Sequence, residues 1–371
     1  MSRLPHIAID AFNAKAAAYL QLHRGQPTQP FIANVQCQVD AIDAGGVLFP
    51  VTVNHGELGN AWVCSPLTTY GHYAREEVDR LGRPWLAAPL RMLAAGFAHW
   101  LQHADIDRAV AINNWLVSTN AYPDLCDVDL GLVIAQARER WPGHALWFRS
   151  LNTTHHAAWL QRLSDMGGVL IPSRQVYLFD DVDTAARERT DLRRDLALLE
   201  RHDAQGRITR YFGDDDFERA AGLYTQLYID KYSMLNPRYG ASVLAAWHRA
   251  NLLELHGIRD AQGVLQGVVG MLRFGDLLTS PIVGYDTHQP ARQGLYRMLA
   301  GLVLRQARRD RAMVNLSAGV AHFKRQRGGQ PAIEYSAVLA GHMPARTRRV
   351  LGALGVTTRR VGVPLMRRYK W

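Results

Sequence analysis

Apolar and polar positions alternate along residues 31–66 in short runs, a pattern that predicts β-strands. The runs 31–40, 46–53 and 60–66 are separated by Asp-Ala-Gly-Gly and His-Gly-Glu-Leu-Gly, which are typical of hairpin turns. Apolar residues then recur at helical spacing over 73–81 and 85–104. Helices at 127–140 and 157–166 are predicted to alternate with strands at 108–113, 145–148, 169–171 and 175–179.

The second half of the chain has a similar order of elements. An acidic cluster at 180–183 ends the first half, and a charged helix is predicted at 184–202. The pattern then predicts strands at 207–212, 252–259, 264–274, 277–285, 312–316 and 333–339, and helices at 217–232, 242–251, 294–309 and 320–326. We therefore expect an α/β protein with two tandem domains, 1–182 and 183–371. Each is expected to have a mixed, mainly antiparallel sheet flanked by helices.

Composition excludes several classes of protein. Apolar residues make up 48% of the 371 residues and charged residues 20%, so the chain has enough apolar material for packed cores. No apolar run is long enough for a membrane span, and the N-terminal residues do not resemble a secretory signal. The cysteines Cys37, Cys64 and Cys126 are few and far apart, which predicts a cytoplasmic protein without a disulfide framework or a bound metal.

Positive charge is concentrated near the C-terminus. Residues 1–300 contain 28 Lys and Arg against 31 Asp and Glu, whereas residues 301–371 contain 15 against 2. Such a concentration attracts a polyanion such as RNA or a phosphate-rich small molecule. An Arg-rich face that is merely solvated remains the alternative.

The loop 286–297 is a candidate phosphate site. A predicted strand ends near Tyr285, a loop with Arg292 and Gly294 follows, and a long helix begins at about Leu295. Backbone N–H groups at a helix start and its dipole favour an anion, and an arginine adds bidentate hydrogen bonds. An ordinary strand–loop–helix corner has the same pattern.

The segment 315–329 is a candidate catalytic element. A predicted strand ends on a polar Asn-x-Ser-x-Gly turn, and a short helix then presents Phe323 and Lys324. Lys324 is one of only four lysines in a chain with 39 arginines. A lysine at this place can stabilise the negative charge that develops on a carbonyl oxygen during acyl transfer. Membership of the basic run Lys-Arg-Gln-Arg is the alternative.

The segment 228–239 has many functional groups and is a candidate acceptor pocket. Asp230 is a candidate general base, although a surface pair with Lys231 is the alternative. Tyr232, Asn236 and Arg238 are candidate substrate-binding residues. The sequence has no HExxH, P-loop or Gly-x-Ser-x-Gly motif, which argues against metalloproteases, NTPases and α/β-hydrolases.

The strand 277–285, the helix start Gln293-Gly294-Leu-Tyr, and the stretch from Ser317 to Pro331 resemble the C-terminal part of the GNAT superfamily. The resemblance is to its branch with two GNAT-like domains, typified by the Fem-type peptidyltransferases. It is strongest over residues 215–340 and only topological over 20–180. Phe323 and Lys324 match the Phe-Lys of that family, which implies that Lys324 stabilises the tetrahedral intermediate.

The resemblance implies aminoacyl-tRNA as donor. Single-domain relatives use acyl-CoA, but the loop 292–297 has only one glycine of the usual coenzyme A motif. We therefore expect direct transfer of an aminoacyl group from tRNA to an amine, hydroxylamine or hydroxyl of a small molecule or peptide, with no tightly bound cofactor and no DNA partner. An acyl-CoA-dependent N-acyltransferase and a non-catalytic RNA-binding module remain as alternatives.

The expected site residues fall into three groups. Lys324, Phe323 and Asp230 are the catalytic candidates. The candidates for substrate binding are Tyr232, Asn236, Arg238, Tyr285 and Ser317. The candidates for donor phosphate contacts are Arg292, Gly294, Arg325, Arg327, Arg346, Arg348 and Arg349.

Overall fold

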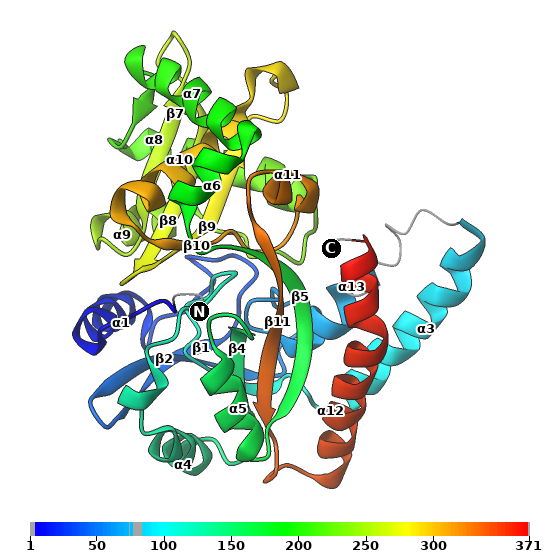
Figure 1. The fold of residues 1–371 in the computed structure, drawn as a ribbon. Helices are drawn as coiled ribbons and strands as arrows, with labels where there is room; N and C mark the ends of the chain where they lie inside the picture. Colours follow the sequence, from blue (N-terminus) through cyan, green and yellow to red (C-terminus); the bar gives the residue numbers. More distant parts are fainter. Residues whose placement is uncertain (1–3, 74, 77–83, 370–371) are drawn as a thin grey trace.

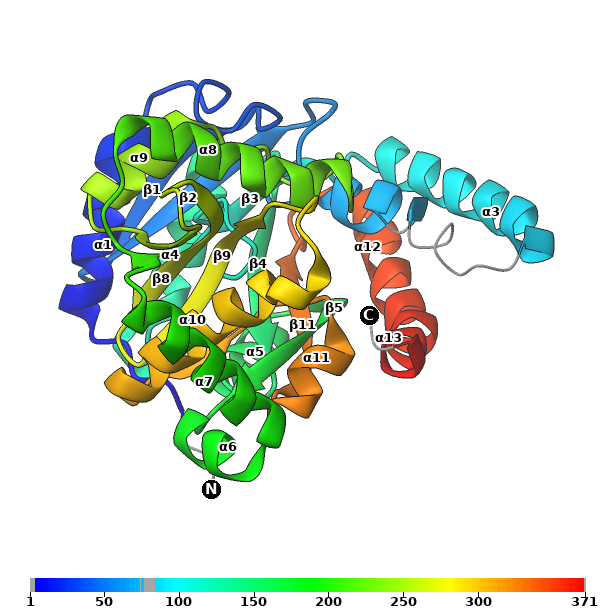
Figure 2. The same ribbon diagram turned by 90° about the horizontal axis from the view of Figure 1, so that it is seen from above.

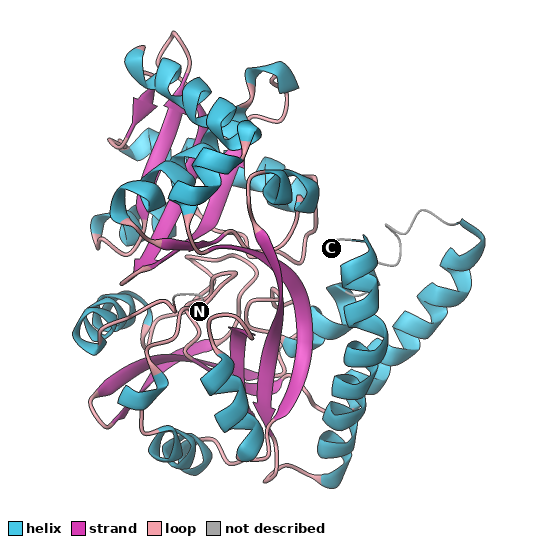
Figure 3. Ribbon diagram, in the orientation of Figure 1, coloured by secondary structure: helices cyan, strands magenta, loops and turns pink. Residues whose placement is uncertain are grey.

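Eleven strands form one mixed sheet with helices on both faces (Figures 1 and 3). The computed structural model describes residues 4–73, 75–76 and 84–369. The strands lie in the order β1-β2-β3-β4-β11-β5-β10-β9-β8-β7-β6. The expected α/β class, with a mixed and mainly antiparallel sheet flanked by helices, is confirmed.

The first half of the chain forms one side of this sheet. Its strands are β1 (Gln38–Ala44), β2 (Val47–His55), β3 (Arg108–Ile112), β4 (Ala145–Asn152) and β5 (Val169–Phe179). The first three pair antiparallel, and β3 runs parallel to β4.

The second half repeats that order on the other side. Its strands are β6 (Ile208–Thr209), β7 (Glu254–Arg259), β8 (Leu265–Phe274), β9 (Leu277–Tyr285), β10 (Met313–Asn315) and β11 (Gln330–Leu339). Strands β6 to β9 pair antiparallel, and β9 runs parallel to β10. Each half is therefore a meander that ends in a parallel pair.

The last strand of each half pairs with the other half. β11 lies between β4 and β5, and β5 lies between β11 and β10. Figure 1 shows β5 and β11 as two long curved strands that run side by side through the molecule. The two halves therefore share one sheet, and the domain boundary near residue 182 stays a prediction.

The strands predicted at 169–171 and 175–179 form one strand, β5. It continues through Pro172, and the ladder with β11 shifts register between Glu334 and Tyr335, opposite this proline. A bulge is a place where a strand tolerates a residue that lacks an N–H donor.

Helices cover both faces. The helices of the first half are α1 (Ile9–His23), α3 (Pro84–His103), α4 (Leu130–Arg140) and α5 (Ala157–Asp165). Those of the second half are α6 (Val182–Glu188), α7 (Thr190–Ala204), α8 (Asp214–Tyr224), α9 (Ala241–Arg249), α10 (Leu295–Asp310), α11 (Ala321–Gln326), α12 (Ala345–Thr357) and α13 (Val363–Tyr369). Figure 2 shows α8 and α9 on one face of β8 and β9, with α7 and α10 on the other.

Some predicted elements differ from the structure. The strand predicted at 60–66 is wrong, because Cys64 and Ser65 donate backbone hydrogen bonds to Ala61 in a turn. The strand predicted at 31–40 begins only at Gln38. The helix predicted at 73–81 lies mostly outside the described residues. Helices α1, α12 and α13 were not predicted at all, although α1 buries residues at helical spacing from Phe12 to His23.

Helix α1 joins the two halves through a shared aromatic core. The Phe12 ring lies 5.6 Å from Phe49 of β2 and 6.0 Å from Phe274 of β8, measured between ring centroids. Trp115 packs edge-on against Phe274 at 4.8 Å and is only 2% exposed. Rings from both halves thus fill one core, where edge-to-face contacts add to the burial of apolar area.

We predict that Trp115→Ala lowers the free energy of unfolding by about 3–5 kcal/mol, because it opens a cavity where the halves meet. Urea titration measures this change. Tyr211→Ala is the control, because Tyr211 is 88% exposed and its change should stay within about 0.5 kcal/mol. Equal effects of the two substitutions would contradict a core shared between the halves.

Candidate active site

Lys324 is buried and fully hydrogen-bonded to main-chain carbonyls. Its Nζ donates to the carbonyl oxygens of Leu316 at 2.7 Å, Ser317 at 3.2 Å and Ala318 at 2.7 Å. Burial, with a smaller contribution from Arg174, lowers the pKa of Lys324 to about 7. All three N–H donors of the ammonium are thus used within the protein, and the expected role as an oxyanion donor stays a prediction.

The loop that Lys324 holds has an unusual backbone. Ser317 and Val320 adopt positive φ values of 58° and 48°, although neither is glycine, and Gly319 has a φ of 81°. Asn315 Oδ1 accepts a hydrogen bond from the Ser317 N–H at 2.8 Å. Such a conformation is disfavoured for side-chain-bearing residues and needs outside support. Lys324 therefore positions the loop between β10 and α11.

A cluster of aromatic rings lies next to this loop. The Phe323 ring lies 4.8 Å from Tyr296 of α10, which lies 6.3 Å from Tyr285 at the end of β9. Tyr228 and Tyr232 lie 6.1 Å apart between ring centroids. Burial raises the pKa of Tyr296, and the nearby Tyr228, Tyr232 and Tyr285 raise it further. The structure thus brings the predicted residues Phe323, Tyr285 and Tyr232 together around Tyr228 and Tyr296.

A second cluster lies beside the rings and consists of Trp62, Arg149, Arg174 and Glu334. The guanidinium groups of Arg149 and Arg174 lie over the Trp62 ring at 5.4 and 4.9 Å from its centroid. Arg174 Nε donates to the buried Glu334 carboxylate at 2.7 Å across the β5–β11 ladder. Burial raises the pKa of Tyr228 and lowers that of Lys324; the charge of Arg174 partly opposes the first shift and adds to the second, so the two clusters are neighbours.

The residues of the predicted acceptor segment 228–239 differ in how closely they contact the two clusters. Asn236 is buried and accepts a hydrogen bond from Trp62 Nε1 at 2.9 Å, while its own Nδ2 donates to the Tyr228 carbonyl at 2.9 Å. The Arg238 N–H donates to Asn34 Oδ1 at 2.8 Å. Asp230 is exposed at the end of the π-helical segment Thr225–Asp230. Asn236 therefore connects the two clusters, whereas the role of Asp230 as a base stays a prediction.

The predicted phosphate contacts are dispersed. Arg292 is exposed in the turn before α10, and Gly294 adopts a left-handed conformation with a φ of 69° at the helix start. Arg325 lies with its guanidinium 5.8 Å from the Tyr177 ring centroid. Arg327 is buried, its Nε donates to Asp195, and its guanidinium lies 3.4 Å from the Phe323 ring centroid. Arg327 therefore pairs with Asp195, and its contact with a phosphate stays a prediction.

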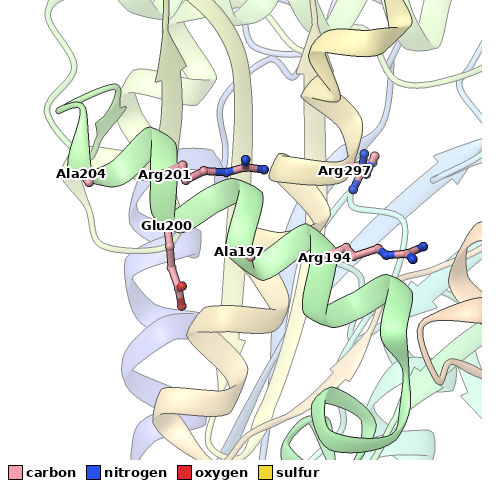
Figure 4. Close-up of a pocket in the computed structure, with 6 residues that line it drawn as sticks. All are labelled: Arg194, Ala197, Glu200, Arg201, Ala204 and Arg297. Carbon is pink, nitrogen blue, oxygen red and sulfur yellow. The ribbon is translucent and has the colours of Figure 1, made fainter.

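An open groove of about 770 Å³ runs between α7 and α10 (Figure 4). Figure 4 shows five of its residues along α7 and Arg297 on α10. Its lining is Arg194, Ala197, Glu200, Arg201, Ala204 and Arg297. Arg297 also donates to Asp195 at 2.6 Å. The groove contains no predicted catalytic residue, and two of its arginines, Arg297 and Arg194, pair with Asp195 and Asp191.

The arginines of the C-terminal segment lie on consecutive helices beside α3 (Figures 1 and 2). Arg346, Arg348 and Arg349 are exposed on α12, and Arg359 and Arg360 are exposed in the segment Thr358–Gly362. No ion pair among the described residues involves Arg346, Arg349 or Arg360, and the sequence has no acidic residue after Glu334. This surface thus keeps its positive charge.

Sequence reasoning missed Trp62, Arg149, Arg174, Tyr296 and Glu334. Tyr296 belongs to the Gln293-Gly294-Leu-Tyr helix start but was not assigned a role. Arg149, Arg174 and Glu334 come together through the pairing of strands β4, β5 and β11, and no local motif marks them.

Within the described ranges, no group of three His, Cys, Asp or Glu residues is placed to hold a metal ion. None of the described helices is long and apolar enough to cross a membrane.

No protein-family model matches the chain, and no curated protein matches its sequence. Solved structures that are similar to it include L-PGS from Bacillus licheniformis, with 10% identity, 66% of this chain and 82% of that chain covered, and a TM-score of 0.47. FemX is 11% identical, with 57% and 76% covered and a TM-score of 0.43.

A tandem GNAT protein from the clavulanic acid biosynthesis pathway is also similar, at 11% identity, with 62% and 75% covered and a TM-score of 0.37.

We predict that Lys324 makes stability pH-dependent above neutrality. The folded-state pKa of about 7 lies below the ordinary value of 10.5, so the unfolded chain binds more protons between these two pH values. The free energy of unfolding should therefore rise with pH across that window, by up to about 1.4 kcal/mol per unit, relative to Lys324→Met. Urea titrations of both proteins from pH 6 to about 10 measure the difference. Parallel pH profiles would contradict a buried lysine with a lowered pKa.

Proposed function

We propose that the chain is an acyltransferase that moves an aminoacyl group from aminoacyl-tRNA to an amine, hydroxylamine or hydroxyl of a small molecule or peptide. The observation that carries this proposal is the buried Lys324, held at a strained loop beside an aromatic cluster. Positive charge next to apolar ring surface suits a reaction in which negative charge develops on a carbonyl oxygen.

An opening between two parallel strands supports the position of the donor. β9 pairs with β10 only over Leu277–Thr279, and its residues 280–285 then continue along β8 alone. In the described part of the chain, no strand pairs with the other edge of residues 280–285. Tyr285 lies at the end of this edge, and Tyr296 lies 6.3 Å from it between ring centroids. An extended acyl arm can hydrogen-bond along such an edge and reach the rings.

The proposed chemistry is direct attack. The acceptor nitrogen or oxygen forms a bond with the ester carbonyl carbon, the tetrahedral intermediate collapses, and the bond from that carbon to the ribose oxygen breaks. Because its three N–H donors are used by carbonyls, Lys324 acts through its charge and by holding the loop. Asp230 is the proposed acceptor of the proton that the nucleophile loses, and it returns that proton to the ribose oxygen as this oxygen leaves.

The arginine surface of α12 and the segment Thr358–Gly362 favours tRNA as donor. Exposed arginines without acidic partners follow each other over two helical turns and more, which suits several phosphates of a nucleic acid. Acyl-CoA is the second candidate, because α10 begins at Gly294 with no side-chain cap and an exposed Arg292 nearby. A small donor of this kind does not need the C-terminal arginines.

We predict that replacing Arg346, Arg349 and Arg360 with alanine slows aminoacyl transfer strongly at moderate salt and little at very low salt. Each lost phosphate contact should reduce the slope of log affinity against log salt by about one. Transfer from charged tRNA across a salt series measures this effect. The control removes Arg138, Arg162 and Arg309, which are exposed elsewhere. If transfer from acyl-CoA is efficient, and its rate does not change with salt or with loss of the C-terminal arginines, acyl-CoA rather than tRNA is the donor.

We predict that Lys324→Ala lowers turnover by on the order of a hundredfold at every salt concentration, because it removes charge at the carbonyl and the support of the loop. A panel of charged tRNAs, acyl-CoAs and amine acceptors measures the turnover, with Arg309→Ala as the control that removes an exposed cation elsewhere. RNA binding without turnover of any donor by the unmodified protein would instead indicate a non-catalytic RNA-binding module.

A further inference from the structure

Trp62 lies against two guanidinium groups at the junction of the two halves. Arg149 comes from β4 and Arg174 from β5, and their guanidinium carbons lie 5.4 and 4.9 Å from the Trp62 ring centroid. The Trp62 side chain is half-buried, so part of the ring remains accessible. Cations over an indole ring are favourable, yet two of them at one ring repel each other.

The hydrogen bonds leave donors of Arg149 unused. Its Nη1 donates to the Val63 carbonyl and to Asn114 Oδ1, both at 2.7 Å. Within the part of the chain that the structure describes, neither its Nε nor its Nη2 has a hydrogen-bond partner in the protein. A guanidinium has five N–H donors in a fixed fork that suits a carboxylate or a phosphate.

The charges around Trp62 do not balance. Burial and the neighbouring Arg174 lower the pKa of Arg149, and Glu334 is the carboxylate whose charge opposes this effect. Glu334 already accepts two hydrogen bonds from Arg174, at 2.7 Å from Nε and 3.2 Å from Nη2. Glu334 is thus the partner of Arg174, and the positive charge of the half-buried Arg149 is costly unless an anion offsets it.

Trp62 is joined to the proposed transfer site. Its Nε1 donates to Asn236, and Asn236 donates to the carbonyl of Tyr228, whose ring belongs to the aromatic cluster. Arg149, Arg174 and Trp62 come from the first half of the chain, whereas Tyr296, Phe323 and Lys324 come from the second. The two sets therefore face the transfer site from different halves.

We propose that Arg149, Arg174 and Trp62 form an acceptor subsite that binds an anionic oxygen group, a carboxylate or a phosphate, on the molecule that receives the acyl group. This inference rests on the proposed function and adds that the acceptor carries a negative charge. Trp62 donates a hydrogen bond to Asn236 of the candidate acceptor segment 228–239, so these arginines lie beside the proposed acceptor pocket. Arg149 supplies the free donors, Trp62 supplies the flat apolar wall, and Glu334 orients Arg174.

The experiment observes Trp62 directly. The protein is labelled with 5-fluorotryptophan, and Trp62→Phe identifies the Trp62 signal among the nine tryptophans. Inorganic phosphate, N-acetylglycine and uncharged tRNA are titrated separately, with sodium chloride at equal ionic strength as reference. We expect the fluorine chemical shift of Trp62 to change saturably with phosphate or with N-acetylglycine. The anion that causes this change identifies whether the site binds a phosphate or a carboxylate.

Variants separate anion binding from a structural role. Arg149→Gln should lower the affinity for the responding anion at least tenfold. Arg149→Lys should keep part of that affinity, because the positive charge is kept. Arg140→Gln is the matched control, since Arg140 lies 4.4 Å over Trp141 and pairs with Asp40 elsewhere. Its affinity should not change. If Arg149→Gln fails to fold, Arg149→Lys and Arg174→Lys still test the site, because each should weaken binding while thermal unfolding stays cooperative.

Several outcomes would overturn the proposal. No movement of the Trp62 signal with either small anion would do so, as would equal movement with sodium chloride. A response to uncharged tRNA alone would assign the arginines to the donor. Acyl transfer to neutral and anionic acceptors with equal efficiency would contradict the acceptor subsite but not the acyltransferase function. Anion binding without transfer from any donor would support the anion site but contradict the proposed function.

Discussion

Two long strands, β5 and β11, hydrogen-bond to each other in the middle of the sheet, and each also pairs with the opposite half of the chain. Their ladder runs from Gln330 opposite Leu178 to Val338 opposite Val169. Because β-strand registers are fixed by such ladders, the two halves cannot rotate freely against each other. The position of every residue at the junction depends on this pairing.

The candidate site lies along these strands. Arg174 and Tyr177 come from β5, and Glu334 comes from β11. Lys324 reaches the same place from the short helix that precedes β11, and its Nζ lies 5.6 Å from the Tyr177 ring centroid. The strand exchange therefore places cations from distant parts of the sequence around one aromatic cluster. Here burial strengthens electrostatic interactions and lowers the pKa of Lys324.

The positive charge of the protein occurs in two physically different settings. Arg149, Arg174 and Lys324 are sheltered, so their charge acts strongly over short distances. Arg346, Arg349 and Arg360 are exposed, so salt screens their charges. Together they attract a long polyanion rather than a single small anion. Arg327 belongs to neither set, because it is buried and paired with Asp195, which also accepts a hydrogen bond from Arg297.

Local patterns determined much of the secondary structure and part of the site. The alternation at 264–274 and 277–285 predicted β8 and β9 closely, and the helical spacing at 294–309 predicted α10, because these signals depend on neighbours in the sequence. The sequence also indicated Phe323, Lys324, Tyr285 and Asn236. Only the tertiary structure decided that β5 and β11 exchange between halves, that Arg327 pairs with Asp195, and that Trp62, Arg149, Arg174 and Glu334 meet. These outcomes rest on contacts between residues more than 80 positions apart, and no local periodicity encodes such contacts.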